Sequence, residues 1–315
     1  MKSLLRRRRL LSGALVPAAI GLALRPAGAV VVLDSTWRAE GGRTGRESEG
    51  FGAHEALARQ PQFASVMSLS EDDGESWDTA SGTWIGNMAG PGGSLQGVVL
   101  TSGHNFEPGE GADNYLYRTL AGTVRRGVRL DIHPLYNRSN NERSGYDAAI
   151  VRLDRAVTDA GPAPALYGGR DEKGRPIVMV GYGMRGIGSV GENADYNDGG
   201  TPAAATNVVD EAMDAVVPPP KGDDGGNWLQ VTLRREGEGA GRLDGLLGSG
   251  DSGGSAWMQV GMQVGMQTER SGWAIVGINA NGTGNATYGE HSEFARVSGL
   301  RDWILRLAPG ARFVG

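Results

Sequence analysis

The stretch from Gly250 to Gly254, which reads Gly-Asp-Ser-Gly-Gly, carries the most distinctive chemistry of the chain. A serine on a tight, glycine-lined turn can expose its hydroxyl while the backbone N–H groups around it converge on one point. An acyl-transfer nucleophile needs the first property, and an oxyanion hole needs the second. Such a segment is otherwise an ordinary surface turn. Ser252 is therefore a predicted nucleophile only if the chain also supplies a base and a group that orients it.

A base and an orienting acid both occur at the ends of predicted strands. His104 comes directly after the apolar run Val98 to Leu100, which predicts a buried strand that delivers the histidine at its end. Asp147 lies where a polar loop runs into the apolar residues 148–153. The order along the chain is His104, Asp147, Ser252. This is the order of the chymotrypsin-type triad, and it differs from that of the other triad folds.

These motifs together resemble the trypsin-like serine proteases of the chymotrypsin fold. Residues 101–105 stand where the family has its histidine signature, residues 147–150 match its aspartate signature, and residues 250–254 match its nucleophile signature without a change. Further segments resemble the family's strands and its terminal helix: 178–183, 276–279 and 295–304. The resemblance implies a serine endopeptidase that hydrolyses polypeptide substrates through an acyl-enzyme intermediate, with no metal and no organic cofactor.

The resemblance also implies roles for residues near the triad. The oxyanion hole would be formed by the backbone N–H groups of Gly250 and Ser252. The position six residues before the nucleophile, which forms the floor of the family's primary specificity pocket, is Leu246. A shift of this loop by a residue or two would instead leave Asp244 at the floor. An apolar floor leads us to expect cleavage after apolar or small residues, since a buried guanidinium without a carboxylate partner is costly. Asn279 and Asn281, on the strand that resembles the wall of the cleft, are the other predicted substrate contacts.

A further family role falls to Asp251, the residue before the nucleophile. In the family this aspartate pairs with a newly freed α-amino group, and the pair organises the oxyanion hole. No obvious processing site with a suitable start follows in this chain. Cleavage after Ala29 would create the β-branched, apolar N-terminus Val30-Val31-Val32. We expect Val30 to be the mature N-terminus, with no separate zymogen cleavage. Asp251 would then pair with the Val30 ammonium, or with an internal group if this segment is too distant.

Two positions depart from the family pattern without touching the triad. The cysteine that usually follows the histidine is Asn105, and the proline expected after the last glycine of the nucleophile motif is Ser255.

Two other readings stay open. A protease-shaped binding protein without activity would share the fold, although such proteins normally lose a triad member. The Gly-x-Ser-x-Gly pattern around Ser252 also fits an esterase of the α/β-hydrolase fold, with His291 as its base. That fold needs strands and helices that alternate around the serine, and no such pattern is visible.

Composition narrows the class of protein. The 315 residues include 53 glycines and no cysteine, so a disulfide framework, a thiol nucleophile and cysteine-based metal sites are excluded. The formal net charge is −5, and no long basic run follows the first ten residues, so nothing favours nucleic-acid binding. We expect a monomer.

The N-terminus has the pattern of an export signal. A basic start with Arg6 to Arg9 precedes a broken apolar stretch, Leu10 to Leu24, and then small residues up to Ala29. The apolar stretch is too short for a membrane span. The arginines also fit a twin-arginine signal. We expect residues 1–29 to be a signal peptide and the mature chain to be secreted or periplasmic, without membrane attachment after cleavage.

The elements that must position the triad read as short strands separated by glycine-rich turns. From the resemblance we expect an all-β fold of two antiparallel Greek-key six-stranded β-barrels with the active site in the cleft between them, followed by a C-terminal α-helix. Residues 30–60 are read as a leader segment. Residues 61–165 should form the N-terminal β-barrel, with His104 and Asp147, and residues 166–315 the C-terminal β-barrel, with Ser252.

Overall fold

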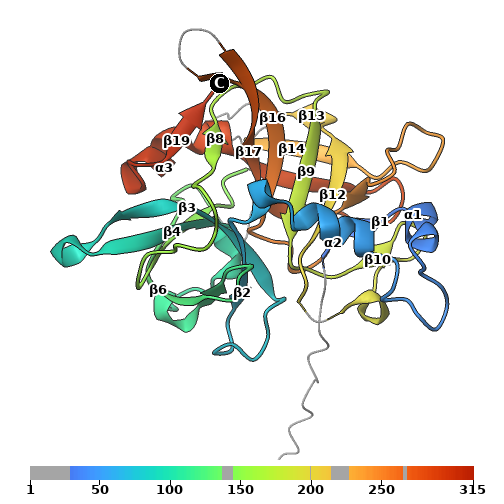
Figure 1. Cartoon of the computed structure of the whole chain (residues 1–315), viewed down its shortest axis with the longest axis horizontal. Coiled ribbons are helices and arrows are strands. Elements are labelled where there is room, and N and C mark those ends of the chain that lie inside the picture. The colour runs from blue at the N-terminus through green and yellow to red at the C-terminus, as the bar shows by residue number, and fades with distance from the viewer. Residues whose placement is uncertain (1–28, 137–144, 199, 214–226, 265–267) are drawn as a thin grey trace, which may run out of the picture.

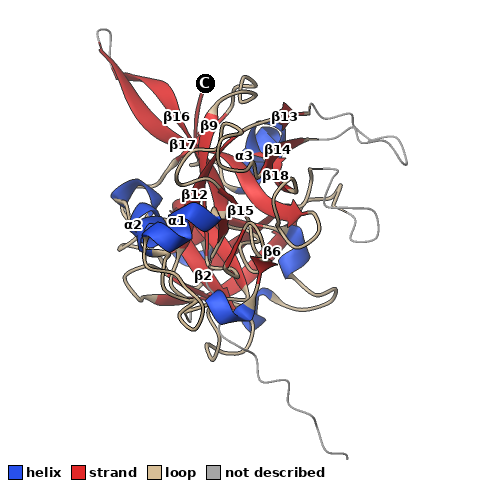
Figure 2. Cartoon of the chain, turned by 90° about the vertical axis from the view of Figure 1, so that its right-hand side faces the viewer, coloured by secondary structure: helices blue, strands red, loops and turns tan. Residues whose placement is uncertain are grey.

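The computed structural model describes residues 29–136, 145–198, 200–213, 227–264 and 268–315. Strands dominate these residues, and the few helices are short (Figure 2). The expected signal peptide lies outside the described residues except for Ala29. Within the described part of the chain, no helix combines the length and apolar character that crossing a membrane requires.

The first half is a closed six-stranded antiparallel barrel. Its strands follow the order β2-β3-β4-β7-β6-β5 around the barrel. This half lies at the lower left of Figure 1, where β2, β3, β4 and β6 are labelled. Their inward-facing side chains fill the interior and include Met67, Leu69, Val99, Tyr117 and Val151. The bounds of the strands are β2 Val66–Ser70, β3 Ala80–Ala89, β4 Leu95–Thr101, β5 Leu116–Arg118, β6 Val124–Ile132 and β7 Ala149–Leu153.

The second half is a strongly curved sheet that stays open. Its path is β12-β9-β16-β17-β18-β14-β13. In addition, β8 pairs with β17, and β19 pairs with β8. The resemblance implies a second six-stranded barrel, and the described strands of this half form a half-barrel. The bounds are β8 Ala165–Tyr167, β9 Pro176–Gly181, β12 Ala203–Val208, β13 Glu211–Ala212, β14 Trp228–Thr232, β16 Ser255–Val264, β17 Thr268–Gly282, β18 His291–Arg296 and β19 Arg312–Val314.

The opening in the second half lies between β12 and β14. There a side chain makes hydrogen bonds to strand carbonyls. The Nδ2 of Asn207 donates to the carbonyl of Thr232 on β14 at 3.1 Å and to that of Gly245 on β15 (Gly245–Leu246) at 3.0 Å. A side-chain amide can satisfy strand carbonyls in this way. It connects the two strands without continuing the sheet.

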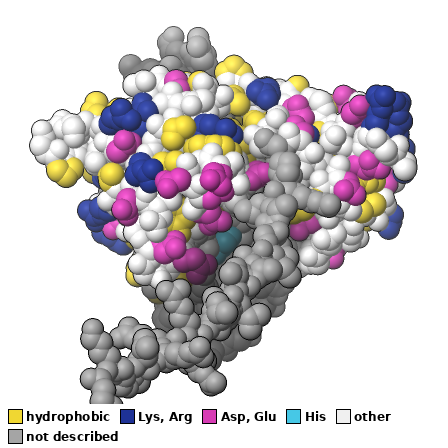
Figure 3. Space-filling view, turned by 90° about the horizontal axis from the view of Figure 1, so that it is seen from below, with side chains coloured by type: hydrophobic (Ala, Val, Ile, Leu, Met, Phe, Trp, Pro, Cys, Tyr) yellow, Lys and Arg dark blue, Asp and Glu magenta, His cyan; other side chains and the backbone are white. Residues whose placement is uncertain are grey.

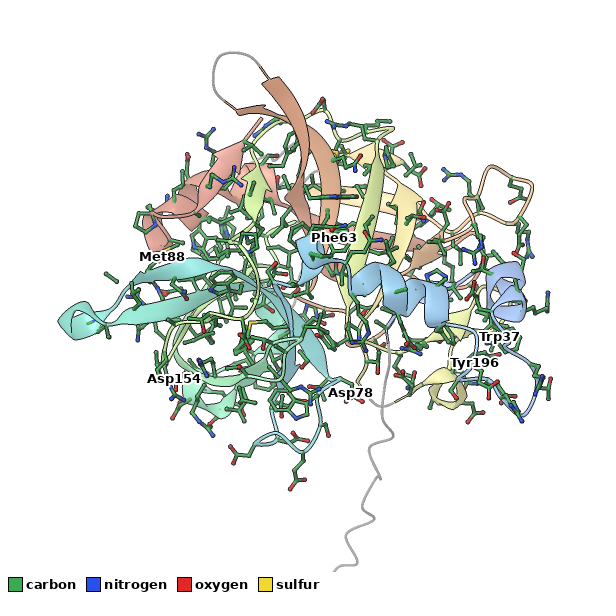
Figure 4. All side chains as sticks on the ribbon, in the orientation of Figure 1. Trp37, Phe63, Asp78, Met88, Asp154 and Tyr196 are labelled. Atoms are coloured by element: carbon green, nitrogen blue, oxygen red, sulfur yellow. The ribbon has the colours of Figure 1, made fainter. Side chains whose placement is uncertain are left out.

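Residues 30–60, which the sequence suggests are a leader, pack into the second half. β1 (Val31–Val32) lies in a small sheet of order β11-β10-β1-β15, with β10 Gly186–Ile187, β11 Gly191–Glu192 and β15 Gly245–Leu246. Helices α1 (Asp34–Ala39) and α2 (Gly52–Ala58) follow. Trp37 contacts Tyr196, with ring centroids 5.6 Å apart (Figure 4). The partners of this segment come from residues far along the chain, which local periodicity cannot reveal.

Two elements join the halves. Phe63, at the end of the 3-10 helix Pro61–Phe63, lies between them and packs edge-on against Trp257 and Trp273 (Figure 4). The C-terminal helix α3 (Arg301–Leu307) follows a 3-10 turn, Val297–Leu300. It packs Trp303 against His133 of the first half. The other 3-10 turns in the described residues are Pro91–Gly93, Gly103–Asn105, Ala112–Asn114 and Ala194–Tyr196.

Candidate active site

Strand register brings His104 and Asp147 together. β4 pairs antiparallel with β7, and Thr101 at the end of β4 lies opposite Ala149 at the start of β7. The residues just beyond these two strand ends therefore meet. A Cβ atom on Gly103 would lie 3.3 Å from the Oδ1 of Asp147 and 3.1 Å from Tyr136, so the absence of a side chain there keeps the approach open.

Asp147 contacts His104 at two points. Its Oδ1 accepts a hydrogen bond from the backbone N–H of His104 at 2.9 Å, and its Oδ2 lies 2.5 Å from the ring Nδ1. Asp147 is completely buried, whereas the imidazole is 24% exposed. The carboxylate thus fixes the ring orientation and favours the tautomer with a proton on Nδ1. The Nε2 atom can then serve as a base.

Ser252 lies on the turn before β16, and the first half of the molecule holds that turn. The carbonyl of Ser252 accepts from the backbone N–H of Ser81 at 2.8 Å and from the Nδ2 of Asn105 at 3.2 Å. The Oγ of Ser81 also donates to the carbonyl of Gly250 at 3.0 Å. The nucleophile turn is therefore anchored to the barrel that supplies His104.

The glycines of this turn are sterically required. Gly253 has φ +83°, and a Cβ there would collide with the Oγ1 of Thr101 and the carbonyl of Ser81. Gly250 has φ +92°, and its Cβ would meet the carbonyl of Asp78. Both backbone conformations are ones that L side chains rarely adopt.

The two departures from the family pattern have partners in this contact region. Asn105 donates to the carbonyl of Ser252, and its Nδ2 also lies 3.1 Å from the Oγ1 of Thr101. The Oγ of Ser255 is 2.8 Å from the Oγ1 of Thr83, across the boundary between the halves. Hydrogen bonds at these positions tie together segments of a chain that has no cysteine.

A cavity of about 190 Å³ has both His104 and Ser252 in its wall. Of the three residues predicted to contact substrate, Asn281 lines this cavity, while Leu246 and Asn279 do not. Leu246 pairs with Val31 and is completely buried in the core of the second half. The rest of the cavity wall consists of Glu192, Leu247, Gly248, Ser249, Ala280, Gly282, Thr283, Gly284, Asn285 and Ala286.

Asn279 supports the nucleophile turn from behind. Its Nδ2 donates to the carbonyls of Val180 and Asp251, each at 3.1 Å, and its own carbonyl accepts from the Oγ of Ser102 at 2.6 Å. It is completely buried. These contacts place it beneath the site, where it holds the second half against Ser102, two residues before His104.

The amides of the nucleophile turn divide into two groups. The N–H groups of Asp251, Gly253 and Gly254 donate to protein carbonyls at 2.8–3.0 Å. Across the residues that the structure describes, the N–H groups of Gly250 and Ser252 have no such acceptor. These two amides are the ones that the sequence predicts for the oxyanion hole.

The carboxylate of Asp251 points away from this cavity, into the protein. It accepts from the backbone N–H groups of Gly183 at 2.9 Å, Gly248 at 2.8 Å and Val30 at 3.3 Å. Complete burial raises the pKa of Asp251 to about 7, although these hydrogen bonds act in the opposite direction. Val30 itself has φ +64°, a strained conformation for a β-branched residue.

His291, the base of the esterase reading, lies on β18 and outside the cavity wall. Its Nδ1 is 3.1 Å from the Oγ1 of Thr232. The nucleophile turn leads into β16, which pairs antiparallel with β17 on one side and with β9 on the other. This architecture is not the parallel, helix-flanked sheet of an α/β-hydrolase, so the fold rules out that reading.

Sequence reasoning missed two contributors to the site. Ser81 lies on β3, which carries no motif, and its contacts depend on how the two halves meet. Glu192 lies on the two-residue strand β11, in a stretch that reads as a glycine-rich loop, and hydrogen bonds with the distant residues Ser249 and Asn285 hold it at the cavity. No local pattern distinguishes either residue.

A comparison with solved structures supports the fold. No protein-family profile and no curated protein sequence matches the chain. Among solved structures, neuropsin, a serine protease expressed in the limbic system of mouse brain, aligns with a TM-score of 0.52 and 17% sequence identity. The alignment covers 78% of this chain and 94% of neuropsin. The expected fold is confirmed: this chain has the chymotrypsin fold, with one closed barrel, one half-barrel and a C-terminal helix.

Proposed function

We propose that this protein is a serine endopeptidase in which Ser252, His104 and Asp147 form the catalytic triad. The observation that carries the proposal is the double contact of Asp147 with His104, beside a cavity that His104 shares with Ser252. The resemblance to chymotrypsin-fold proteases supports the same assignment. Polypeptides are the proposed substrates.

The proposed mechanism follows from these contacts. The Oγ of Ser252 attacks the scissile carbonyl while the Nε2 of His104 takes its proton, and His104 then returns that proton to the leaving amine. Asp147 holds the imidazole and stabilises the imidazolium. The N–H groups of Gly250 and Ser252 bind the oxyanion, where one donor is worth about 10²–10³ in kcat. Water then attacks the carbonyl of the acyl-enzyme while His104 takes its proton. His104 gives that proton to the Oγ of Ser252 as the acyl group leaves.

The preference for apolar or small residues that the sequence suggests depends on Leu246 as the floor of the specificity pocket, and Leu246 does not line this cavity. The proposal therefore takes its specificity from the residues that line the cavity.

The chain is further proposed to act outside the cytoplasm after removal of residues 1–29, with Val30 as its N-terminus. The strained φ of Val30 supports this cleavage, because φ is a rotation about the N–Cα bond defined by the preceding carbonyl. Hydrolysis of the peptide bond before Val30 removes that torsion, whose strain is about 1–3 kcal/mol. The new ammonium would lie beside the Asp251 carboxylate.

The test is hydrolysis of an unstructured protein such as casein by the purified chain that begins at Val30. The proposal predicts cleavage by the wild-type protein and none by the Ser252→Ala variant. A folded wild-type protein that cleaves neither casein nor a mixed peptide library would favour the inactive, protease-shaped binding protein.

A further inference from the structure

The cavity beside His104 and Ser252 contains a single carboxylate, that of Glu192. Among the described residues that line it, Glu192 is the only Asp, Glu, Lys or Arg. Its strand, β11, lies far before the nucleophile turn in the sequence and pairs with β10. The family position for a charged pocket floor, occupied here by Leu246, therefore does not account for this charge.

Glu192 is held firmly at the cavity wall. Its Oε2 accepts from the backbone N–H of Ser249 at 2.6 Å, and its Oε1 accepts from the Oγ of Ser249 at 2.8 Å. Its backbone N–H donates to the carbonyl of Asn285 at 2.9 Å, and the Nδ2 of Asn285 returns a bond to the carbonyl of Glu192 at 3.2 Å. Glu192 is thus fastened to both walls of the cavity, which are the nucleophile turn and the loop after β17.

The cavity also offers room for a long side chain. Three of its lining residues are glycines, Gly248, Gly282 and Gly284, and Leu247 supplies apolar surface. A side chain with an apolar stem and a charged end fits such a wall, because the stem packs on apolar atoms while the end reaches a polar partner.

We propose that Glu192 determines specificity by selecting substrates with Arg or Lys on the amino side of the scissile bond. The inference rests on the proposed endopeptidase function. Each oxygen of Glu192 accepts one hydrogen bond from Ser249 and retains a further acceptor position. A guanidinium can donate to both oxygens of one carboxylate in parallel.

The charge of the cavity favours the same class of substrate, because Glu192 is the only charged side chain among its described lining residues. Figure 3 shows acidic side chains (magenta) near a histidine (cyan) on the lower face of the molecule. A cavity lined by one sign of charge attracts ligands of the opposite sign.

A binding experiment separates this proposal from catalysis. We would measure the affinity of the Ser252→Ala protein for benzamidine, a cation, and for benzamide, its neutral analogue, by calorimetry. The account predicts that benzamidine binds at least about tenfold more tightly, and that Glu192→Gln reduces this ratio at least about fivefold. The matched control is Glu211→Gln, which removes the same charge from β13, a strand that does not line the cavity. This control should leave the ratio unchanged.

A kinetic experiment on the active protein tests the role of Glu192 independently. Two peptides that differ only in Arg or citrulline before the scissile bond differ in charge and hardly in shape. The wild-type protein should show a kcat/KM at least about tenfold higher for the Arg peptide, and Glu192→Gln should lower that ratio.

Equal affinities for benzamidine and benzamide, or a ratio that Glu192→Gln leaves unchanged, would overturn the assignment of Glu192. Loss of the endopeptidase function itself is distinguishable from this result. It would appear as a wild-type protein that hydrolyses neither peptide, whatever it binds.

Discussion

Asp147 binds His104 through the backbone as well as through the imidazole. One carboxylate oxygen accepts the backbone N–H of His104 at 2.9 Å, and the other lies 2.5 Å from its Nδ1. The backbone bond fixes where the histidine stands, and the ring contact fixes how it faces. Asp147 can do both because it is completely buried and β4 pairs directly with β7.

The first prediction is that Asp147→Asn lowers kcat by about 10⁴. An asparagine can still accept the backbone N–H of His104, so the fold should remain. Its amide would donate towards Nδ1 and force the proton onto Nε2, where the ring can no longer act as a base. Steady-state kinetics and thermal unfolding of the variant check this. An active variant, or one that loses activity only because it unfolds, would contradict the role.

The second prediction concerns Ser252 and His104 as a unit. Ser252→Ala and His104→Ala should each lower kcat by about 10⁴–10⁶, and the double variant should lose little more, because each change alone already disables the proton transfer. Single-turnover and steady-state rates of the three variants measure this. Losses that multiply in the double variant would show that the two residues act independently.

The third prediction concerns the amino group of Val30 and the pH dependence of stability. Burial places the folded-state pKa of Asp251 at about 7, above the ordinary value of 3.8. A chain in which Val30 is an amide therefore loses stability as pH rises from about 4 to about 7, by an amount on the order of 4 kcal/mol. A free ammonium at Val30 would stabilise the ionised carboxylate and remove this loss.

The comparison is between a chain that begins at Val30 and the same chain with its α-amino group acetylated. The Tm of the free form should exceed that of the acetylated form by more at about pH 7.5 than at about pH 5. A difference in Tm that does not grow with pH would refute the pairing of Val30 with Asp251.

The fourth prediction concerns the packing of the nucleophile turn. Gly253→Ala should cost more than about 3 kcal/mol of unfolding free energy, because the new methyl group would collide with Thr101 and Ser81 and φ is +83°. The matched control is Gly122→Ala, at φ +95° with nothing within 4 Å of the added Cβ, which carries only the backbone strain of about 1–2 kcal/mol. Denaturant unfolding measures both. Equal costs would show that the contact between the halves is not tight.

The residues of the candidate site differ in how far the sequence reveals them. His104 follows an apolar strand and Asp147 precedes one, each within a short motif. The pairing of β4 with β7 then brings the two residues together. The direction in which a side chain points along an irregular loop is not encoded locally. Counting back from Ser252 reaches Leu246, but the pairing of β15 with β1 turns that residue into the core.

The fold likewise has features that the sequence predicts and features that depend on contacts between distant residues. The resemblance to the chymotrypsin fold predicts the closed barrel and the C-terminal helix, which the structure confirms. The open edge of the second half depends on the side chain of Asn207, and the burial of residues 30–33 depends on β10 and β15. These contacts join residues that lie far apart in the sequence, so the local pattern of apolar and polar residues does not predict them.

The measurement that tests the central claim most directly is covalent labelling of the active-site serine. The purified protein would be treated with a fluorophosphonate probe, and the labelled residue would be located by mass spectrometry. A triad predicts one label on Ser252 in the wild-type protein, abolished by His104→Ala although the serine is still present. A folded wild-type protein without a label on Ser252, or with a label that persists in His104→Ala, would contradict the account.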